Sequence, residues 1–143
     1  MPALEPQYME ILKQILAERF IPFLPTLSGT SKPANEQQTR QLSRAFSAFT
    51  LHKLLNLTPQ EAAASVVDDI NDKGIDTIYY HASSETLYLL QAKLKNSEQF
   101  KQEDALSFCE GVRLLLRQEF NLFNKHILNR QAEIENALDI CSN

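Results

Sequence analysis

Hydrophobic residues near the start of the chain follow the spacing of an amphipathic helix over about residues 5–20. They recur every three or four positions, which places them on one helix face; they are Tyr8, Ile11, Leu12, Ile15, Leu16 and Phe20. Residues 22–33 break this period with prolines, a glycine and several Ser and Thr, as is typical of an irregular connection. The helical spacing returns from about residue 35 to residue 55. The first part of the chain therefore predicts two helices joined by a loop.

A third, short helix is predicted to begin directly after the second. Thr58 supplies a hydroxyl at the N-cap position, Pro59 occupies the first helical position and Glu61 the third. In this arrangement the two polar side chains satisfy two backbone N–H groups that the helix itself leaves unpaired. We expect the helix to continue through residues 62–67.

The pattern then changes to that of a β-hairpin over residues 75–94. This stretch is rich in β-branched and aromatic residues on either side of the polar sequence HASSE, which predicts the turn. A turn centred on the two serines of HASSE puts Asp76 opposite Gln91, with Lys93 two residues further along the second strand. Because strand side chains alternate between faces, we expect these three polar side chains to lie on one face of the hairpin.

Two further helical stripes follow the hairpin within residues 98–140. The first comprises Leu106, Cys109, Val112 and Leu116, and the second comprises Phe120, Phe123, Ile127, Ile134 and Leu138. Each stripe predicts a long helix. The fold class expected from these elements is α+β, mostly helical, with a small sheet built on the hairpin and a single domain over residues 1–143.

Composition narrows the setting in which this domain works. At 143 residues and 43% hydrophobic, the chain can bury a core of its own. It has neither a basic and apolar leader nor an apolar run close to the about 20 residues of a membrane span. Cys109 and Cys141 match no disulfide or zinc spacing. We expect a cytoplasmic protein with reduced thiols and no membrane partner.

The charge and the short motifs exclude several classes of function. A net charge of -4 argues against a protein that coats nucleic acid, because such proteins neutralise phosphates with Lys and Arg. It leaves a nuclease open, since catalytic sites concentrate carboxylates. The chain has only three glycines and no GxSxG sequence, which argues against phosphate loops and acyl transfer.

The three polar residues of the hairpin suit phosphodiester hydrolysis assisted by Mg²⁺ or Mn²⁺. Hard divalent cations take oxygen ligands, which Asp76, the Gln91 side-chain carbonyl and the Ala92 main-chain carbonyl can supply. Lys93 can hold or help deprotonate the attacking water and offset charge on the phosphorus. On the residues alone, a structural role for all three stays open.

The sequence NDKGIDTIYY followed by LYLLQAK resembles the GID…QxK variant of the PD-(D/E)XK nuclease motif. This variant occurs in Mrr-like restriction endonucleases, and the likeness is greatest to the N-terminal domain of abortive infection phage resistance (AIPR) proteins. The resemblance covers about residues 67–116 and implies a restriction-endonuclease-like fold with endonuclease activity on phage or foreign DNA. It implies that Asp76 is a metal ligand, that Gln91 replaces the usual glutamate and that Lys93 is catalytic.

The chain departs from this pattern in two respects. Gln91 is neutral, so the site needs another carboxylate, and Asp72, Asp69 and Glu36 are the candidates; Asp72 and Glu36 suit turn and helix caps equally well. A two-stranded hairpin is also marginal alone, and the fold normally adds a strand after the long helix. We therefore expect the chain to be the N-terminal part of a longer protein, or to be completed by another chain.

Other functions and partners remain open at the level of sequence. A catalytically degenerate nuclease fold that binds nucleic acid or protein is the main alternative, and a helical interaction domain that forms a homodimer is another. If the chain binds nucleic acid, DNA is favoured over RNA, with Lys93 and Lys95 as candidate contacts. The three histidines form no ligand pattern, and each is expected to be a surface or capping residue: they are His52, His81 and His126.

Overall fold

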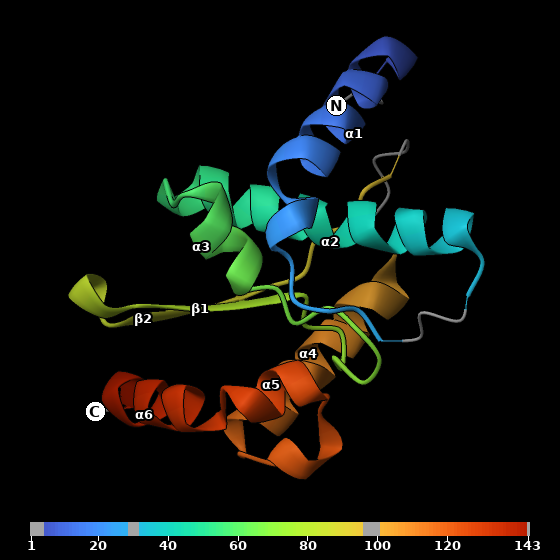
Figure 1. Ribbon diagram of the computed structural model, residues 1–143. Helices are drawn as coiled ribbons and strands as arrows, with labels where there is room; N and C mark the ends of the chain where they lie inside the picture. The colour runs from blue at the N-terminus through green and yellow to red at the C-terminus, as the bar shows by residue number, and fades with distance from the viewer. Residues whose placement is uncertain (1–4, 29–31, 96–100, 143) are drawn as a thin grey trace. The chain divides into compact units, whose positions relative to one another are not determined.

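The computed structural model describes residues 5–28, 32–95 and 101–142. It contains mostly helices and one two-stranded antiparallel sheet (Figure 1), which confirms the expected α+β class. The chain divides into two compact units. The first unit comprises Met1–Val66 and Ala92–Lys101, and the second comprises Val67–Gln91 and Gln102–Asn143.

The first unit is built from α1 (Pro6–Arg19), the short 3-10 helix η1 (Ile21–Phe23), α2 (Ala34–Leu55) and α3 (Pro59–Ala64). Both α1 and α3 contact α2. The Phe20 ring at the end of α1 meets the Phe49 ring of α2 edge-on at 5.9 Å between centroids. The two long helices therefore lie where the hydrophobic spacing predicts them.

The predicted start of α3 is confirmed, whereas its predicted end is wrong. The Thr58 hydroxyl accepts a hydrogen bond from the Glu61 amide at 3.1 Å and donates one to Glu61 Oε1 at 3.1 Å. The helix stops at Ala64 rather than continuing to Val67. The Val67 amide bonds instead to the Asp76 carbonyl at 2.9 Å, so hairpin pairing ends the helix.

The second unit contains the hairpin of β1 (Thr77–His81) and β2 (Thr86–Leu90), joined by the 3-10 turn η2 (Ala82–Ser84). The register is the one that a turn at the two serines predicts, with Thr77 opposite Leu90 and His81 opposite Thr86. The strands are shorter than the predicted span of 75–94. Lys93 lies outside them, so strand alternation does not fix its face.

The C-terminal part of the second unit is more broken than predicted. Helix α4 (Gln102–Leu116) matches the first stripe, but the second stripe is divided among η3 (Phe120–Leu122), α5 (Lys125–Asn129) and α6 (Gln131–Ser142). The prediction of one long second helix is therefore wrong. Asn124 causes one of the breaks, because its side chain caps α5 by accepting a hydrogen bond from the Ile127 amide at 3.1 Å.

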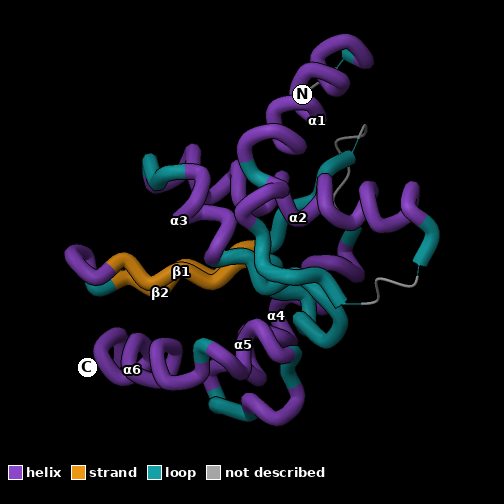
Figure 2. The backbone as a smooth tube through the Cα atoms, in the orientation of Figure 1, coloured by secondary structure: helices purple, strands orange, loops and turns teal. Residues whose placement is uncertain are grey.

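One hydrophobic cluster joins the hairpin to these helices. Helix α6 contacts β2. The two strands of the hairpin are the orange segments in Figure 2. The buried members of the cluster are Val67, Ile75, Ile78, Leu115, Phe120, Phe123, Ile127, Ile134 and Leu138. The second stripe thus faces the core, although it is not one helix. The first predicted stripe does not, because Leu106, Cys109 and Leu116 are exposed and α4 contributes Leu115 to the cluster instead. None of the helices in the described residues combines the length and apolar character needed to cross a membrane.

The loop from residue 68 to residue 76 lies against α4 at a very short backbone distance. A Cβ atom added to Gly111 of α4 would lie 1.9 Å from the Lys73 carbonyl oxygen. Gly74 has a φ of +82°, and a Cβ there would lie 2.9 Å from the Phe108 amide nitrogen. Glycine at position 111 is therefore a requirement of the packing between the loop and α4.

We predict that Gly111→Ala destabilises the protein even though alanine is the better helix former. The propensity gain is about 1 kcal/mol, whereas overpacking typically costs about 1–3 kcal/mol, and here the obstacle is backbone rather than a flexible side chain. Urea unfolding measures the change. Glu110→Ala, at the exposed neighbouring position, should change the free energy of unfolding by less than about 0.5 kcal/mol. Equal stability of Gly111→Ala and the parent would contradict the packing argument.

Candidate metal centre

Three carboxylates gather in the loop that leads into β1. One oxygen each from Asp68, Asp72 and Asp76 lies within 4.8 Å of the other two. Asp76 is buried, with 5% of its surface exposed, and the other two residues are half-buried. We call Asp68, Asp72 and Asp76 the acidic cluster.

Main-chain hydrogen bonds of Asp76 explain why the cluster forms. The Asp76 amide donates to the Leu90 carbonyl at 2.8 Å, which ties it to the end of β2. The Asp76 carbonyl accepts from the amides of Val67 at 2.9 Å and Asp68 at 3.1 Å. These hydrogen bonds hold the first residues of the loop against its last residue, which brings Asp68 beside Asp76.

Asp72 both shapes the loop and belongs to the cluster. Its Oδ1 accepts from the Gly74 amide at 2.8 Å, and its Oδ2 accepts from the Asp69 amide at 3.3 Å. Asn71, Lys73 and Gly74 have positive φ angles of 59°, 57° and 82°. The turn-cap interpretation of Asp72 is therefore correct. It is compatible with a ligand role, because each carboxylate oxygen has a second lone pair.

Gln91 directly follows the last paired residue of β2. Thr77 and Leu90 are the last paired residues of the hairpin, and Asp76 and Gln91 are the next residue on each strand. Within the described part of the chain, Gln91 Oε1 is buried and accepts no hydrogen bond. Buried acceptors nearly always have a partner, so this oxygen is available to a further group.

The donor set fits Mg²⁺ or Mn²⁺ better than softer metals. Three carboxylates are hard ligands, and such cations prefer oxygen. Like charges this close repel one another, and a bound cation would convert that repulsion into attraction. The chemistry of the donors therefore matches the expected metal.

Four other predicted site residues belong to the first unit. Ala92 follows Gln91 and is half-buried, Lys93 is exposed, and Lys95 is half-buried. Glu36, in the same unit, is exposed and forms an ion pair with Lys32 at 3.2 Å at the start of α2. The geometry of the acidic cluster rests on second-unit residues and includes none of these four.

The prediction that His126 is a surface or capping residue is wrong, and Asp69, one of the three candidate acids, is not a member of the acidic cluster. His126 is buried at 8% exposure, and its Nε2 lies 2.9 Å from Asp69 Oδ2. Asp69 is therefore engaged in a buried contact with His126. His81 occupies the N-cap position of η2 without a side-chain cap hydrogen bond, and its Nδ1 lies 2.7 Å from the hydroxyl of Ser84 in the turn.

Sequence reasoning missed Asp68 as a member of the cluster. The signal available was the spacing, since Asp68, Asp72 and Asp76 follow one another at intervals of four residues. In a helix that spacing would mark one face. Here it arises from a loop closed on itself, which the spacing alone does not indicate.

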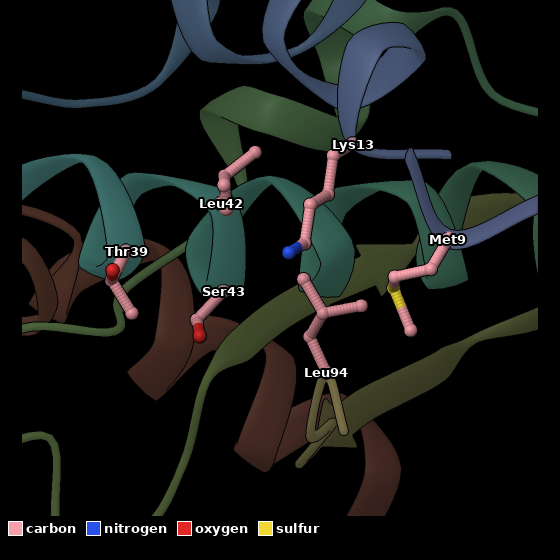
Figure 3. Close-up of a pocket in the computed structure, with 6 residues that line it drawn as sticks. All are labelled: Met9, Lys13, Thr39, Leu42, Ser43 and Leu94. Carbon is pink, nitrogen blue, oxygen red and sulfur yellow. The ribbon is translucent and has the colours of Figure 1, made fainter. Parts of the chain in front are cut away.

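A pocket in the first unit does not carry comparable chemistry. It has a volume of about 190 Å³, and the Lys13 ammonium is directed into it (Figure 3). The residues that line it are Met9, Lys13, Thr39, Leu42, Ser43 and Leu94. None of these residues is a carboxylate or an imidazole, so the pocket offers no metal ligand set.

The chain matches no protein-family model, no curated protein and no solved structure. Its resemblance to PD-(D/E)XK nucleases therefore rests on the GID and QAK sequences alone.

Proposed function

We propose that the chain is a divalent-metal-dependent DNA endonuclease domain of the PD-(D/E)XK type, acting against phage or foreign DNA. The observation that carries the proposal is the position of Asp76. Asp76 belongs to the acidic cluster. It also directly precedes Thr77, whose partner Leu90 directly precedes Gln91. Two parts of the motif that are 15 positions apart in the sequence meet at one end of the hairpin.

In this proposal Asp76 is the fixed ligand of Mg²⁺ or Mn²⁺. Its side chain is buried, and its backbone makes hydrogen bonds in both directions, so its position is set before any metal binds. Asp68 and Asp72 supply the negative charge that a neutral Gln91 lacks, and the Gln91 amide oxygen completes the set. The metal, when bound, supplies Lewis acidity at the scissile phosphate and lowers the pKa of bound water.

Lys93 is proposed as the catalytic lysine on the strength of the resemblance. It follows Gln91 by two residues, as QxK requires, and its side chain is exposed. Its part is to hold the attacking water and to offset the charge that develops on the phosphate. Lys95 and the Ala92 carbonyl keep their predicted parts, as a DNA contact and a further ligand respectively.

A restriction-endonuclease-like fold is part of the same proposal. The described residues hold two strands, which pack against the C-terminal helices, whereas the resemblance implies a sheet with further strands. A longer protein or a second chain would supply them. The alternative is a binding module without catalysis, which the neutral Gln91 and the net charge of -4 favour.

We predict saturable Mn²⁺ binding that depends on Asp76. Asp76→Asn keeps the size of the side chain and removes one charged ligand, so Mn²⁺ affinity should fall at least about tenfold, the effect of roughly 1.4 kcal/mol. Isothermal calorimetry on the chain measures it. Asp139→Asn is a matched control, because Asp139 is exposed on α6. The nearby Cys141 thiol donates to the Glu85 carbonyl, so this part of α6 lies at the turn end of the hairpin, whereas Asp76 lies at the open end. Equal binding by Asp76→Asn and the parent would remove Asp76 from the site.

We predict that Gln91→Glu tightens Mn²⁺ binding by about tenfold, because a carboxylate attracts the cation more strongly than an amide does. Gln102→Glu adds the same charge at the exposed start of α4 and should leave the affinity unchanged within about twofold. An unchanged affinity in Gln91→Glu would show that this side chain does not reach the metal.

We predict that Lys93→Ala separates metal binding from catalysis. Cleavage of plasmid DNA by the complete protein should fall at least about 100-fold, the usual contribution of a group that assists proton transfer. Mn²⁺ affinity should stay within about threefold, because lysine is not a ligand. Lys101→Ala, at another exposed position of the first unit, is the control. Undiminished cleavage by Lys93→Ala would exclude the lysine from the mechanism, and a complete protein that binds Mn²⁺ without cutting would favour the binding module.

A further inference from the structure

The loop that carries the acidic cluster is held by a second set of residues at the start of α5. Asn124 Nδ2 donates to the Val67 carbonyl at 2.8 Å, and the Asn124 amide donates to the Asn71 carbonyl at 3.1 Å. His126 Nε2 lies 2.9 Å from Asp69 Oδ2. We call these three contacts the α5 clasp. The two side-chain contacts each join residues that are 57 positions apart in the sequence.

The histidine of the clasp reaches the cluster through Asp69. Both side chains are buried, with 8% of His126 and 1% of Asp69 exposed. An ionised carboxylate only accepts hydrogen bonds, so His126 donates from Nε2. Asp69 Oδ1 accepts from the Ile70 amide at 2.8 Å, and the Asp69 amide donates to Asp72 Oδ2 at 3.3 Å. The His126 imidazole therefore holds Asp69, and the Asp69 amide in turn orients the Asp72 carboxylate.

The asparagine of the clasp reaches the cluster through Val67. Its amide group is divided between two tasks, because Oδ1 caps α5 at the Ile127 amide while Nδ2 holds the Val67 carbonyl. Val67 in turn donates its own amide to the Asp76 carbonyl at 2.9 Å. A single buried side chain thus links the start of α5 to the backbone of the principal ligand.

We propose that Asn124 and His126 are positioning residues of the candidate metal centre. The inference rests on the proposed function and extends it beyond the GID…QxK motif. The loop contains two non-glycine residues with positive φ, Asn71 and Lys73, and three carboxylates that repel one another, and both features favour its opening. Contacts from outside the loop must therefore hold the carboxylates together for a metal to find them preformed. Hydrogen bonds one layer behind the ligands typically change metal affinity by about 10–100-fold.

A purely structural clasp is the rival explanation, in which these contacts stabilise the fold and leave metal affinity unaffected. The two explanations differ in which property follows the hydrogen bonds. A positioning role predicts that Mn²⁺ affinity falls when the clasp is cut and that a conservative donor restores it. A structural role predicts that affinity is indifferent to the clasp as long as the protein is folded.

The chain offers variants that cut one contact at a time. Asn124→Ser keeps an oxygen that can cap α5, since serine is a favoured N-cap residue, but it lacks the donor to Val67. His126→Leu removes the donor to Asp69, whereas His126→Gln keeps an N–H group for it. Ile134→Val removes a methyl group from the same core and leaves the clasp intact, so it controls for a loss of stability alone.

The test is Mn²⁺ calorimetry on the whole chain, with urea unfolding of each variant. We expect Asn124→Ser and His126→Leu to weaken Mn²⁺ binding about 10–100-fold. His126→Gln and Ile134→Val should remain within about threefold of the parent, less than a lost second-layer contact costs. If His126→Leu does not fold, Asn124→Ser and His126→Gln still decide the question.

Parent-like Mn²⁺ affinity in a folded Asn124→Ser variant would overturn the positioning role and leave the clasp structural. An affinity loss in Ile134→Val equal to that in Asn124→Ser would overturn it too, because stability would then be the cause. Failure of the proposed function looks different: Mn²⁺ binding is absent from the parent, or is the same in Asp76→Asn.

Discussion

Much of the second unit depends on the three main-chain hydrogen bonds of Asp76. The Asp76 amide donates to the Leu90 carbonyl at the end of β2, and the Asp76 carbonyl accepts hydrogen bonds from the amides of Val67 and Asp68. A buried backbone group that lacks a partner is costly, so these bonds are a strict constraint on the chain. They end α3 before Val67, they set where the hairpin begins and they close the acidic loop. One residue thereby fixes the ends of two elements and the position of the carboxylates.

The loop closed by Asp76 combines local backbone strain with three carboxylates that lie close together. Left-handed backbone at Asn71 and Lys73 is unfavourable for residues with a side chain, and so are three carboxylates within 4.8 Å of one another. Two external supports offset these costs. Gly111 lets the loop backbone lie directly on α4, and the clasp from α5 holds the loop at Val67, Asp69 and Asn71. Strain concentrated in one loop and supported from outside is common at functional sites.

The features predicted correctly from sequence are those set by neighbours along the chain. The hairpin register follows from a symmetric turn at Ser83 and Ser84, and the start of α3 follows from Thr58 and Glu61. The features that sequence reasoning missed are set by distant partners. Nothing near Asn124 announces that its amide must serve both Ile127 and Val67, and so the break in the second stripe was not foreseen. The burial of His126 depends on Asp69 in the same way.

The same distinction bears on how Gln91 should be interpreted. Within the motif, a neutral residue in place of glutamate suggests a site that has lost its charge and hence its metal. In the folded chain the missing charge has a source outside the motif, because Asp68 and Asp72 lie beside Asp76. The total charge of a metal site matters more to a hard cation than which strand each ligand comes from. A glutamine at this position is therefore compatible with an intact metal centre, provided that the loop holds its carboxylates together. Under the proposed function, the negative charge of the site comes from the loop rather than from the residue after β2, and the contacts that support the loop become part of the site.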